Sequence, residues 1–363
     1  MRKTYLDNIR SVVVILVVIY HVIMMFTNII PLGAGSFAEV QYQDAYMYLV
    51  YPWFMVILFV VSGMSTRFYL DKHTTKEFVR SRTVKLLVPS TLSLFVFHWI
   101  TGYFSMSMAG AFDTMPEELP SVIKYFIMVL SGQGVLWYIQ LLWLFSMVLA
   151  IFHKLEKGRL YNLTGKMNFP LIIALVIPLW AFAQILNTPV ITVYRFGLYG
   201  FSFFVGYYIF AHDEIINRIS KYWLFTTIAT AIMGIAYTVI YFGQNFADAP
   251  VNRSVFNIVF CWTAVLCVFG IFKRFFDRDN GFFRFIGKRS FGLYIFHYTP
   301  LAAAAYYIYP VEMPCVFKYL VCAVAAFVGG YALNELFSRI PFFRWVLLGI
   351  SKKKAKGVEA NVR

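Results

Sequence analysis

Charged residues are scarce in this chain of 363 residues. Only 13% are Asp, Glu, Lys or Arg, whereas 60% are hydrophobic and 20% are aromatic. A soluble domain carries about 25% charged and roughly 45–50% apolar residues, so the composition excludes a soluble globular protein. Most apolar runs reach the ~20 residues that a membrane-spanning α-helix needs. The period-2 alternation of a transmembrane barrel is lacking, and the fold is therefore predicted to be an all-α integral membrane protein.

Cysteines and known catalytic signatures are also sparse. The four cysteines lie in or beside apolar runs without CxxC spacing, which argues against a zinc site or a disulfide framework. They are expected to be small buried hydrophobic residues. Walker A, dinucleotide-binding, HExxH and nucleophile-elbow sequences are absent. We therefore expect no metal and no permanently bound cofactor, and any phosphate would be held by basic side chains and helix ends.

Acidic residues are outnumbered by basic ones, 17 to 32, and the formal charge is +15. The distribution of the basic residues argues against nucleic acid as the reason. Apolar runs predict ten spans, near 11–30, 46–66, 86–108, 134–153, 169–187, 196–211, 222–242, 254–272, 290–309 and 316–337. Between them, 28 of the 32 basic residues fall on the side of the N-terminus, and only Lys124, Arg195, Arg253 and Lys318 fall on the other. This asymmetry follows the positive-inside rule and predicts both termini in the cytoplasm.

The domain organisation is expected to be simple, with one polytopic domain over 1–350 and a basic, disordered cytoplasmic tail over 351–363. The first apolar stretch continues to about Ile30 without a small-x-small cleavage site, so we expect a retained helix rather than a signal peptide. Residues 121–133 are expected to form an interfacial or re-entrant helix.

The first span carries two polar residues that an apolar helix does not need. Arg10 and His21 are eleven residues apart, which is about 20° past three full turns, so they share one helix face. Their axial separation is about 16 Å at 1.5 Å per residue. Arg10 is therefore expected at the cytoplasmic interface, where Asp7 is placed to pair with it, and His21 near mid-membrane.

This arrangement suggests a division of labour along the helix. Arg10 would hold an anionic group while His21, whose imidazole titrates near pH 6.5, would take a proton from a hydroxyl and return it. Ionisable groups inside membranes tend to mark functional pathways. The alternative is a structural histidine bonded to a backbone carbonyl of a neighbouring helix.

Further basic residues follow at the same predicted interface. Ser62-Gly63 ends the second apolar run, and Arg67 comes four residues later; Arg82 and Lys85 precede Pro89. Such cations could bind the phosphates of a nucleotide-containing ligand, with arginine giving bidentate contacts. The competing explanation is ordinary positive-inside charge.

A polar stripe occurs late in the chain, where Ser290, Tyr294 and His297 stand at i, i+4 and i+7. They are expected to line the cavity of His21 or to join helices by hydrogen bonds. Trp137 and Gln140 are further candidates for a cavity wall. His98, His153 and His212 give weaker signals.

Five stretches, taken in order, resemble the motifs of the membrane-bound acyltransferase 3 family. "YLDNIRSVVVILVVIYH" matches a Leu-Asp-x-x-Arg start with arginine and histidine separated by ten residues, and "LFVVSG" an apolar run ending in Ser-Gly. "RTVKLLVP" is similar to a basic-x-x-basic stretch ending in proline, "LWYI" to a fourth-helix tryptophan motif, and "SFGLYIFH" to a late Ser-x-x-x-Tyr-x-x-His segment. The match covers nearly the whole chain, and ten spans are expected of the family.

The resemblance implies transfer of an acetyl or succinyl group from cytoplasmic acyl-CoA to a hydroxyl of a glycan or glycolipid, in the inner membrane. His21 would be the catalytic base, with His297 and Tyr294 matching the late motif. Arg10 would bind the donor, together with Ser62, Arg67, Arg82 and Lys85. Acyl-CoA would be a cosubstrate, and the transfer could be direct or pass through a covalent acyl-histidine.

The sequence departs from the family where many members carry paired glutamates after the fourth-helix tryptophan, since this chain has "WYIQLLWLF". With no esterase-like domain appended, it is more similar to the branch that includes glucan succinyltransferases. Arg195 and Arg253 are candidates for a cation that selects the acyl group. The alternative function is a proton-coupled transporter of an anionic solute, with His21 and His297 as a relay. The oligomeric state is not predicted.

Overall fold

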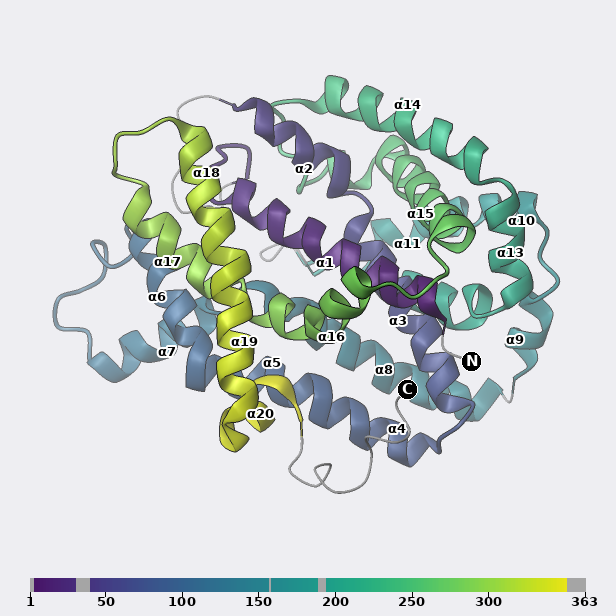
Figure 1. The fold of residues 1–363 in the computed structure, drawn as a ribbon, viewed down its shortest axis with the longest axis horizontal. Coiled ribbons are helices and arrows are strands. Elements are labelled where there is room, and N and C mark those ends of the chain that lie inside the picture. Colours follow the sequence, from purple (N-terminus) through teal and green to yellow (C-terminus); the bar gives the residue numbers. More distant parts are fainter. Residues whose placement is uncertain (1–2, 31–39, 157, 189–193, 351–363) are drawn as a thin grey trace. The chain divides into compact units, whose positions relative to one another are not determined.

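The structure of the protein is a computed structural model that describes residues 3–30, 40–156, 158–188 and 194–350 (Figure 1). The predicted tail over 351–363 lies outside these residues. Helices make up most of the described ranges, which contain no β-strand; within them, a single antiparallel β-bridge pairs Asn187 with Arg195. The predicted all-α membrane fold is confirmed.

Seven helices in the described part of the chain are long and apolar enough to cross a membrane: Thr4–Met24, Tyr42–Leu70, Thr75–Met108, Gly134–Glu156, Trp223–Tyr241, Val255–Phe275 and Cys315–Arg339. They coincide with seven of the ten predicted spans. Two more predicted spans coincide with the shorter apolar helices Phe169–Gln184 and Phe196–Phe210. The last, 290–309, is divided between two helices at His297. Ten spans and two cytoplasmic termini stay predictions.

The chain forms two compact units. Unit 1 comprises Met1–Thr75 and Phe145–Ser290, and unit 2 comprises Lys76–Leu144 and Phe291–Arg363. Two helices, α8 (Trp137–Glu156) and α16 (Gly281–Phe296), contribute several residues to each unit, and α4 (Thr75–Arg82) has its first residue in unit 1 and the rest in unit 2.

Unit 1 consists of the first helices of the chain and most of its middle. Its helices are α1 (Thr4–Met24), η1 (Tyr42–Asp44), α2 (Ala45–Val50), α3 (Phe54–Leu70), α9 (Arg159–Thr164), α10 (Phe169–Ala174), α11 (Val176–Gln184), α12 (Phe196–Val205), η5 (Gly206–Phe210), α13 (Asp213–Lys221), α14 (Trp223–Tyr241), η6 (Val251–Arg253) and α15 (Val255–Phe275).

Unit 2 joins the third predicted span to the C-terminal helices. Its elements are α4 (Thr75–Arg82, which begins one residue before the unit), η2 (Thr83–Leu87), α5 (Val88–Ser93), η3 (Leu94–His98), α6 (Trp99–Met108), α7 (Ser121–Ser131), η4 (Gly134–Leu136), α17 (Tyr298–Ile308), α18 (Cys315–Val324), η7 (Ala325–Gly329), α19 (Gly330–Arg339) and α20 (Pro341–Leu348). In Figure 1, α18 and α19 follow one another as one long rod.

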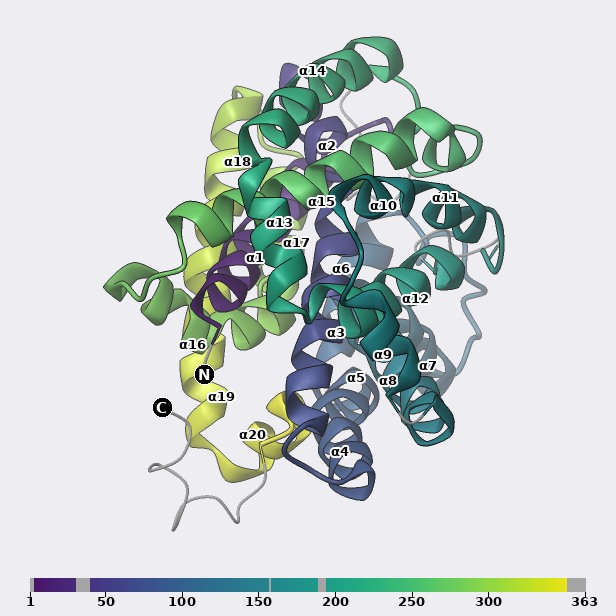
Figure 2. The same cartoon turned by 90° about the vertical axis from the view of Figure 1, so that its right-hand side faces the viewer.

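Two neighbouring helices of unit 1, α14 and α15, differ in how much of their apolar surface is buried in the protein. α14 lies along α15 in both views (Figure 1, Figure 2). Only 17% of the apolar window of α14 is buried in the protein, against 61% for α15. The exposed positions of α14 include Ile228, Ile232 and Val239. These apolar side chains suit a lipid-facing surface, so α14 shields α15 from the bilayer.

Small residues allow the central crossing of unit 1. A Cβ on Gly63 of α3 would overlap the carbonyl oxygen of Phe203 in α12, and a Cβ on Gly206 of η5 would overlap that of Val60 in α3. The two glycines therefore let the backbones touch from both sides, which is how helices commonly pack in membranes. Because Arg67 lies one turn after Gly63 on α3, this crossing fixes the position of Arg67 relative to α12 and η5.

In unit 2, glycines allow the same close approach of two helices, here α6 and α7. Cβ atoms on Gly102 and Gly132 would overlap the carbonyl oxygens of Met128 and His98. The reciprocal contact brings α7 against the π-helical segment η3, which ends at His98. π-Helical segments are uncommon and frequently accompany functional sites.

Replacement of Gly63 by alanine is expected to destabilise the protein. The new methyl group has no space beside the Phe203 carbonyl, so the helices must separate, at a cost of about 1–3 kcal/mol for overpacking. Thermal unfolding of the purified protein in detergent measures the effect. Gly281→Ala is the matched control, since nothing lies within 4 Å of a Cβ there. Equal melting temperatures for the two variants would contradict the proposed packing.

Candidate functional site

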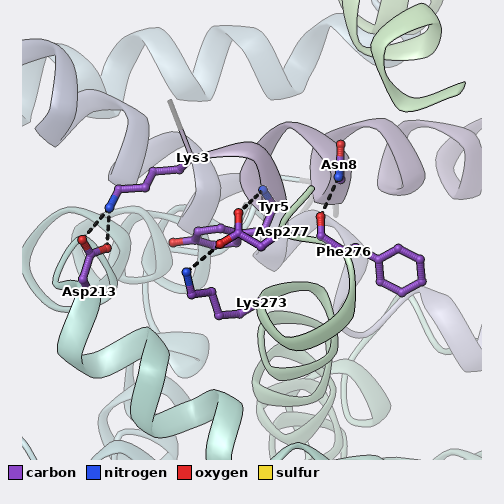
Figure 3. A network of polar contacts seen from close by, with 7 residues as sticks. All are labelled: Lys3, Tyr5, Asn8, Asp213, Lys273, Phe276 and Asp277. Carbon is purple, nitrogen blue, oxygen red and sulfur yellow. Dashed lines mark hydrogen bonds and ion pairs between the residues drawn. The ribbon is translucent and has the colours of Figure 1, made fainter. Parts of the chain in front are cut away.

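The start of α1 is held by charged residues from two other helices of unit 1 (Figure 3). Lys3 Nζ donates to Asp213 Oδ1 over 2.6 Å, at the first residue of α13. The backbone N–H of Tyr5 donates to Asp277 Oδ1 over 3.3 Å, and Lys273 Nζ pairs with Asp277 Oδ2 at 2.6 Å. Partly exposed pairs of this kind stabilise by only about 0–1 kcal/mol each, so their role here is to set the position of α1.

A buried amide makes the stronger attachment. Asn8 is 2% exposed, and its Nδ2 donates to the backbone oxygens of Phe276 over 2.7 Å and Arg278 over 3.2 Å. Leaving such a buried group unpaired would cost about 1–3 kcal/mol. Rotation of α1 about its axis would break these bonds, and the face that carries Arg10 is therefore fixed.

Arg10 is clamped between two helices. Its Nη1 donates to Asp7 Oδ1 over 3.1 Å, as the i, i+3 spacing predicts, and its Nη2 donates to Ser65 Oγ over 2.7 Å. Ser65 belongs to α3 and donates its own proton to the Val61 carbonyl. The Arg10 side chain is still 34% exposed. The guanidinium is thus oriented while part of it stays open to a ligand.

His21 lies in the last turn of α1 and is half-buried. Because α1 is one uninterrupted α-helix, Arg10 and His21 share a face, with a rise of about 16 Å between them. The neighbouring Tyr20 stacks on Tyr51 with ring centroids 6.0 Å apart and also contacts Phe54 at 5.1 Å. These rings attach the His21 end of α1 to the segment joining α2 and α3.

Arg67 lies in an aromatic cage at the end of α3. Its guanidinium carbon is 3.8 Å from the centroid of the Tyr161 ring, and its Nε is 3.1 Å from Asp71 Oδ1. Nη1 also donates to the Tyr207 hydroxyl over 3.4 Å. A cation over an aromatic face is stabilised by the ring quadrupole. The predicted donor-binding residue is therefore firmly positioned.

The other predicted residue of α3 has a packing role. Ser62 is 8% exposed, and its carbonyl accepts a hydrogen bond from Thr66 Oγ1 over 2.9 Å. It adjoins Gly63, where α3 meets α12.

Arg82 and Lys85 belong to unit 2, whereas Arg10 and Arg67 belong to unit 1. Arg82 ends α4, with its guanidinium carbon 5.3 Å from the Phe78 ring centroid. Lys85 lies exposed in the π-helical segment η2. A common donor site for these four cations stays a prediction.

The late polar stripe is tied to the start of α8. The Tyr294 hydroxyl donates to the Val135 carbonyl over 2.6 Å, and its ring lies 5.5 Å from that of Tyr138. Trp137, the first residue of α8, is half-buried beside Tyr138. The late motif and the tryptophan motif therefore lie together in unit 2.

Two further candidates make local hydrogen bonds. Ser290 Oγ donates to the Gly287 carbonyl over 3.1 Å, one turn earlier in α16. Gln140 accepts from Gln133 Nε2 over 2.7 Å and donates to the Ser90 carbonyl over 3.0 Å. The Gln140 amide thus links η4 and α5.

His297 is fully buried, and the contacts of its ring define the tautomer. Nδ1 lies 3.0 Å from the Leu293 carbonyl oxygen and 2.9 Å from that of Tyr294. Carbonyl oxygens only accept hydrogen bonds, so Nδ1 carries the proton and Nε2 keeps its lone pair. Nε2 is therefore the nitrogen able to act as a base.

His98, a weaker candidate in the sequence, is buried and incompletely hydrogen-bonded in the structure. It is 1% exposed, and its Nε2 has no hydrogen-bond partner. Nearby, the Thr101 and Thr299 hydroxyls lie 2.6 Å apart, and the ring centroids of Phe97 and Phe296, which precede His98 and His297, are 5.6 Å apart. Only its depth in an apolar run set His98 apart in the sequence. Unit 2 therefore contains a buried pair of histidines.

The sequence matches the family model described as an acyltransferase domain over residues 3–335. The chain belongs to the membrane-bound acyltransferase 3 family. No curated protein and no solved structure matches it significantly. The predicted family and the acyltransferase class are confirmed, and the glucan succinyltransferase-like branch stays a prediction. In this acyltransferase the match includes both Arg10 and His21, together with the segment that carries His297.

The cage around Arg67 predicts a pH dependence of stability. The ring of His212 stacks on Tyr161 at 3.8 Å, and its Nε2 lies 2.9 Å from the Tyr161 carbonyl oxygen. Burial lowers the pKa of His212 below its ordinary value, against the opposing effect of that hydrogen bond. The unfolded chain then binds a proton more readily than the folded one, so His212 lowers stability as pH falls through about 6.5.

Melting temperatures between about pH 7.5 and 5.5 measure this contribution. His212→Gln is expected to lose less stability over this interval than the wild type. His73→Gln, at an exposed position, is the control and is expected to follow the wild type. An unchanged pH response in His212→Gln would rule out His212 as a source of the effect.

Proposed function

We propose that this acyltransferase moves an acyl group from acyl-CoA to a hydroxyl of a glycan or glycolipid, with His21 as the general base. The observation that carries the proposal is the helix α1. It places His21 about 16 Å along one face from Arg10, which Asp7 and Ser65 hold in position. An extended pantetheine arm suits this separation, with the phosphates at Arg10 and the thioester near His21.

The basic residues predicted at the cytoplasmic side support the donor site. Arg67, whose guanidinium is held over Tyr161 in the same unit as Arg10, is the kind of group that recognises phosphate. Membership of the family supports acyl transfer over the alternative of a proton-coupled transporter.

The reaction follows from the chemistry of imidazole. Neutral His21 takes the proton of the acceptor hydroxyl while its oxygen attacks the thioester carbonyl. The tetrahedral intermediate expels CoA thiolate, which receives the proton from the imidazolium. An ester forms, a thioester bond breaks, and free CoA thiol is released.

Release of CoA thiol from acetyl-CoA and succinyl-CoA, with and without a glucan acceptor, tests this function. The His21→Gln variant is expected to lose about 10²–10⁴-fold in rate, which is the usual contribution of general-base catalysis. His73→Gln, an exposed histidine on the loop after α3, is the matched control and is expected to retain full turnover.

Full turnover in a folded His21→Gln protein would remove His21 as the base and favour His297. Proton-coupled flux of an anion with no thiol release from either donor would contradict the enzyme and support the transporter.

A further inference from the structure

Arg195 is a buried cation at the opposite side of the predicted membrane from Arg10. It is 2% exposed and occupies the N-cap position of α12. The N-terminus of a helix carries partial positive charge, so this is an unfavourable place for an arginine without a counter-charge. Arginine stays charged when buried, and the site therefore holds a positive charge in a region of low polarity.

The partners of Arg195 inside the protein are insufficient for that charge. Nη2 donates to the Asn252 carbonyl over 2.7 Å, whereas Nε has no hydrogen-bond partner. No carboxylate of the described residues forms an ion pair with it. Buried charges are normally paired, and an uncompensated one is strongly destabilising.

Three asparagine side chains near Arg195 have amide oxygens without a hydrogen-bond partner. Asn187, Asn252 and Asn257 each use Nδ2 to donate to a backbone carbonyl, of Ala183, Ala247 and Asn252 respectively. These bonds leave all three Oδ1 atoms without a partner. Nearly all buried polar groups in proteins are hydrogen-bonded, so unpaired oxygens gathered beside a buried cation favour a binding site for a polar ligand.

The amides belong to the neighbourhood of Arg195. Asn187 pairs with Arg195 in the single β-bridge of the described residues, and the backbone carbonyl of Asn252 accepts from the guanidinium. Asn257 lies in the first turn of α15, whose N-cap is Ser254. Hydroxyl groups of a ligand would donate hydrogen bonds to the free amide oxygens, and anionic oxygens of the same ligand would accept hydrogen bonds from Arg195.

The His21 end of α1 reaches this region through aromatic residues of unit 1. Tyr20 stacks on Tyr51, whose ring centroid lies 4.7 Å from that of Phe246. The next residue, Ala247, accepts a hydrogen bond from the Asn252 side chain, which belongs to the surroundings of Arg195. Arg195 is thus near the segment that packs against His21, at the end of α1 remote from Arg10.

We propose that Arg195 and the amide oxygens of Asn187, Asn252 and Asn257 form a binding site for a substrate oxyanion, a carboxylate or phosphate with neighbouring hydroxyl groups. The site deepens the proposed function and rests on it. Two sources share this chemistry. The oxyanion is either the free carboxylate of a dicarboxylic acyl group such as succinyl, or an acidic group on the glycan or glycolipid acceptor.

Binding is tested on the full-length protein by thermal stabilisation with sodium succinate and with inorganic phosphate, against sodium chloride of equal ionic strength. The wild type is expected to be stabilised by at least one of the two anions. Arg195→Gln is expected to lose this stabilisation. Lys124→Gln removes a cation on the same predicted face and is expected to respond like the wild type.

A wild-type protein that neither anion stabilises would overturn the proposal, as would an Arg195→Gln protein stabilised to the same extent. Where Arg195→Gln does not fold, Arg195→Lys keeps the charge but loses the bidentate geometry. Its half-saturating anion concentration is expected to rise about tenfold, in line with the loss of one charge-assisted hydrogen bond. An unchanged concentration would contradict the site.

Thiol release then identifies the source of the oxyanion. A fall of about tenfold in the succinyl-CoA to acetyl-CoA rate ratio of Arg195→Gln would assign it to the acyl group. An equal loss with both donors and a raised acceptor KM would assign it to the acceptor. Unchanged rates with both donors would overturn the proposal. Anion binding through Arg195 in a protein that releases no thiol would leave the site standing and reject the proposed function.

Discussion

The attachment of α1 at its first two turns is the constraint on which the catalytic proposal depends. Most of the length of α1 is apolar and packs against other apolar helices, so hydrophobic contacts alone leave its rotation weakly specified. The buried Asn8 amide and the pairs of Lys3 and Tyr5 remove that freedom. Every residue further along the helix then has a fixed direction, including His21 thirteen positions after Asn8.

The arginines of unit 1 differ in how completely their guanidinium groups are paired. Arg10 and Arg67 are held by neighbouring side chains without being fully enclosed, since Asp7, Ser65 and Tyr161 bond one side of each guanidinium. Such preorganisation favours ligand binding because little conformational freedom remains to be lost. Arg195 differs, because it is enclosed yet incompletely paired. Arg10 and Arg67 are thus partly exposed and paired, whereas Arg195 is buried with its Nε unpaired.

Relations within one helix could be predicted from the sequence, and those between helices could not. The Asp7–Arg10 pair and the shared face of Arg10 and His21 follow from helical periodicity, which a continuous α1 preserves. Ser65 and Tyr161 meet their arginines only through packing. In a membrane helix almost every face is apolar, so hydropathy does not indicate which faces meet. His98 gave only a weak signal in the sequence for the same reason: its relation to His297 depends on the contact of two distant segments.

The affinity of the purified protein for CoA, measured by isothermal titration, tests the roles assigned to the two ends of α1 most directly. Arg10→Gln is expected to raise Kd about tenfold or more through the loss of a charge-assisted contact, whereas His21→Gln is expected to leave Kd within about twofold. That split would separate a donor anchor from a catalytic base. An unchanged Kd in Arg10→Gln, or an equal loss in both variants, would contradict the account.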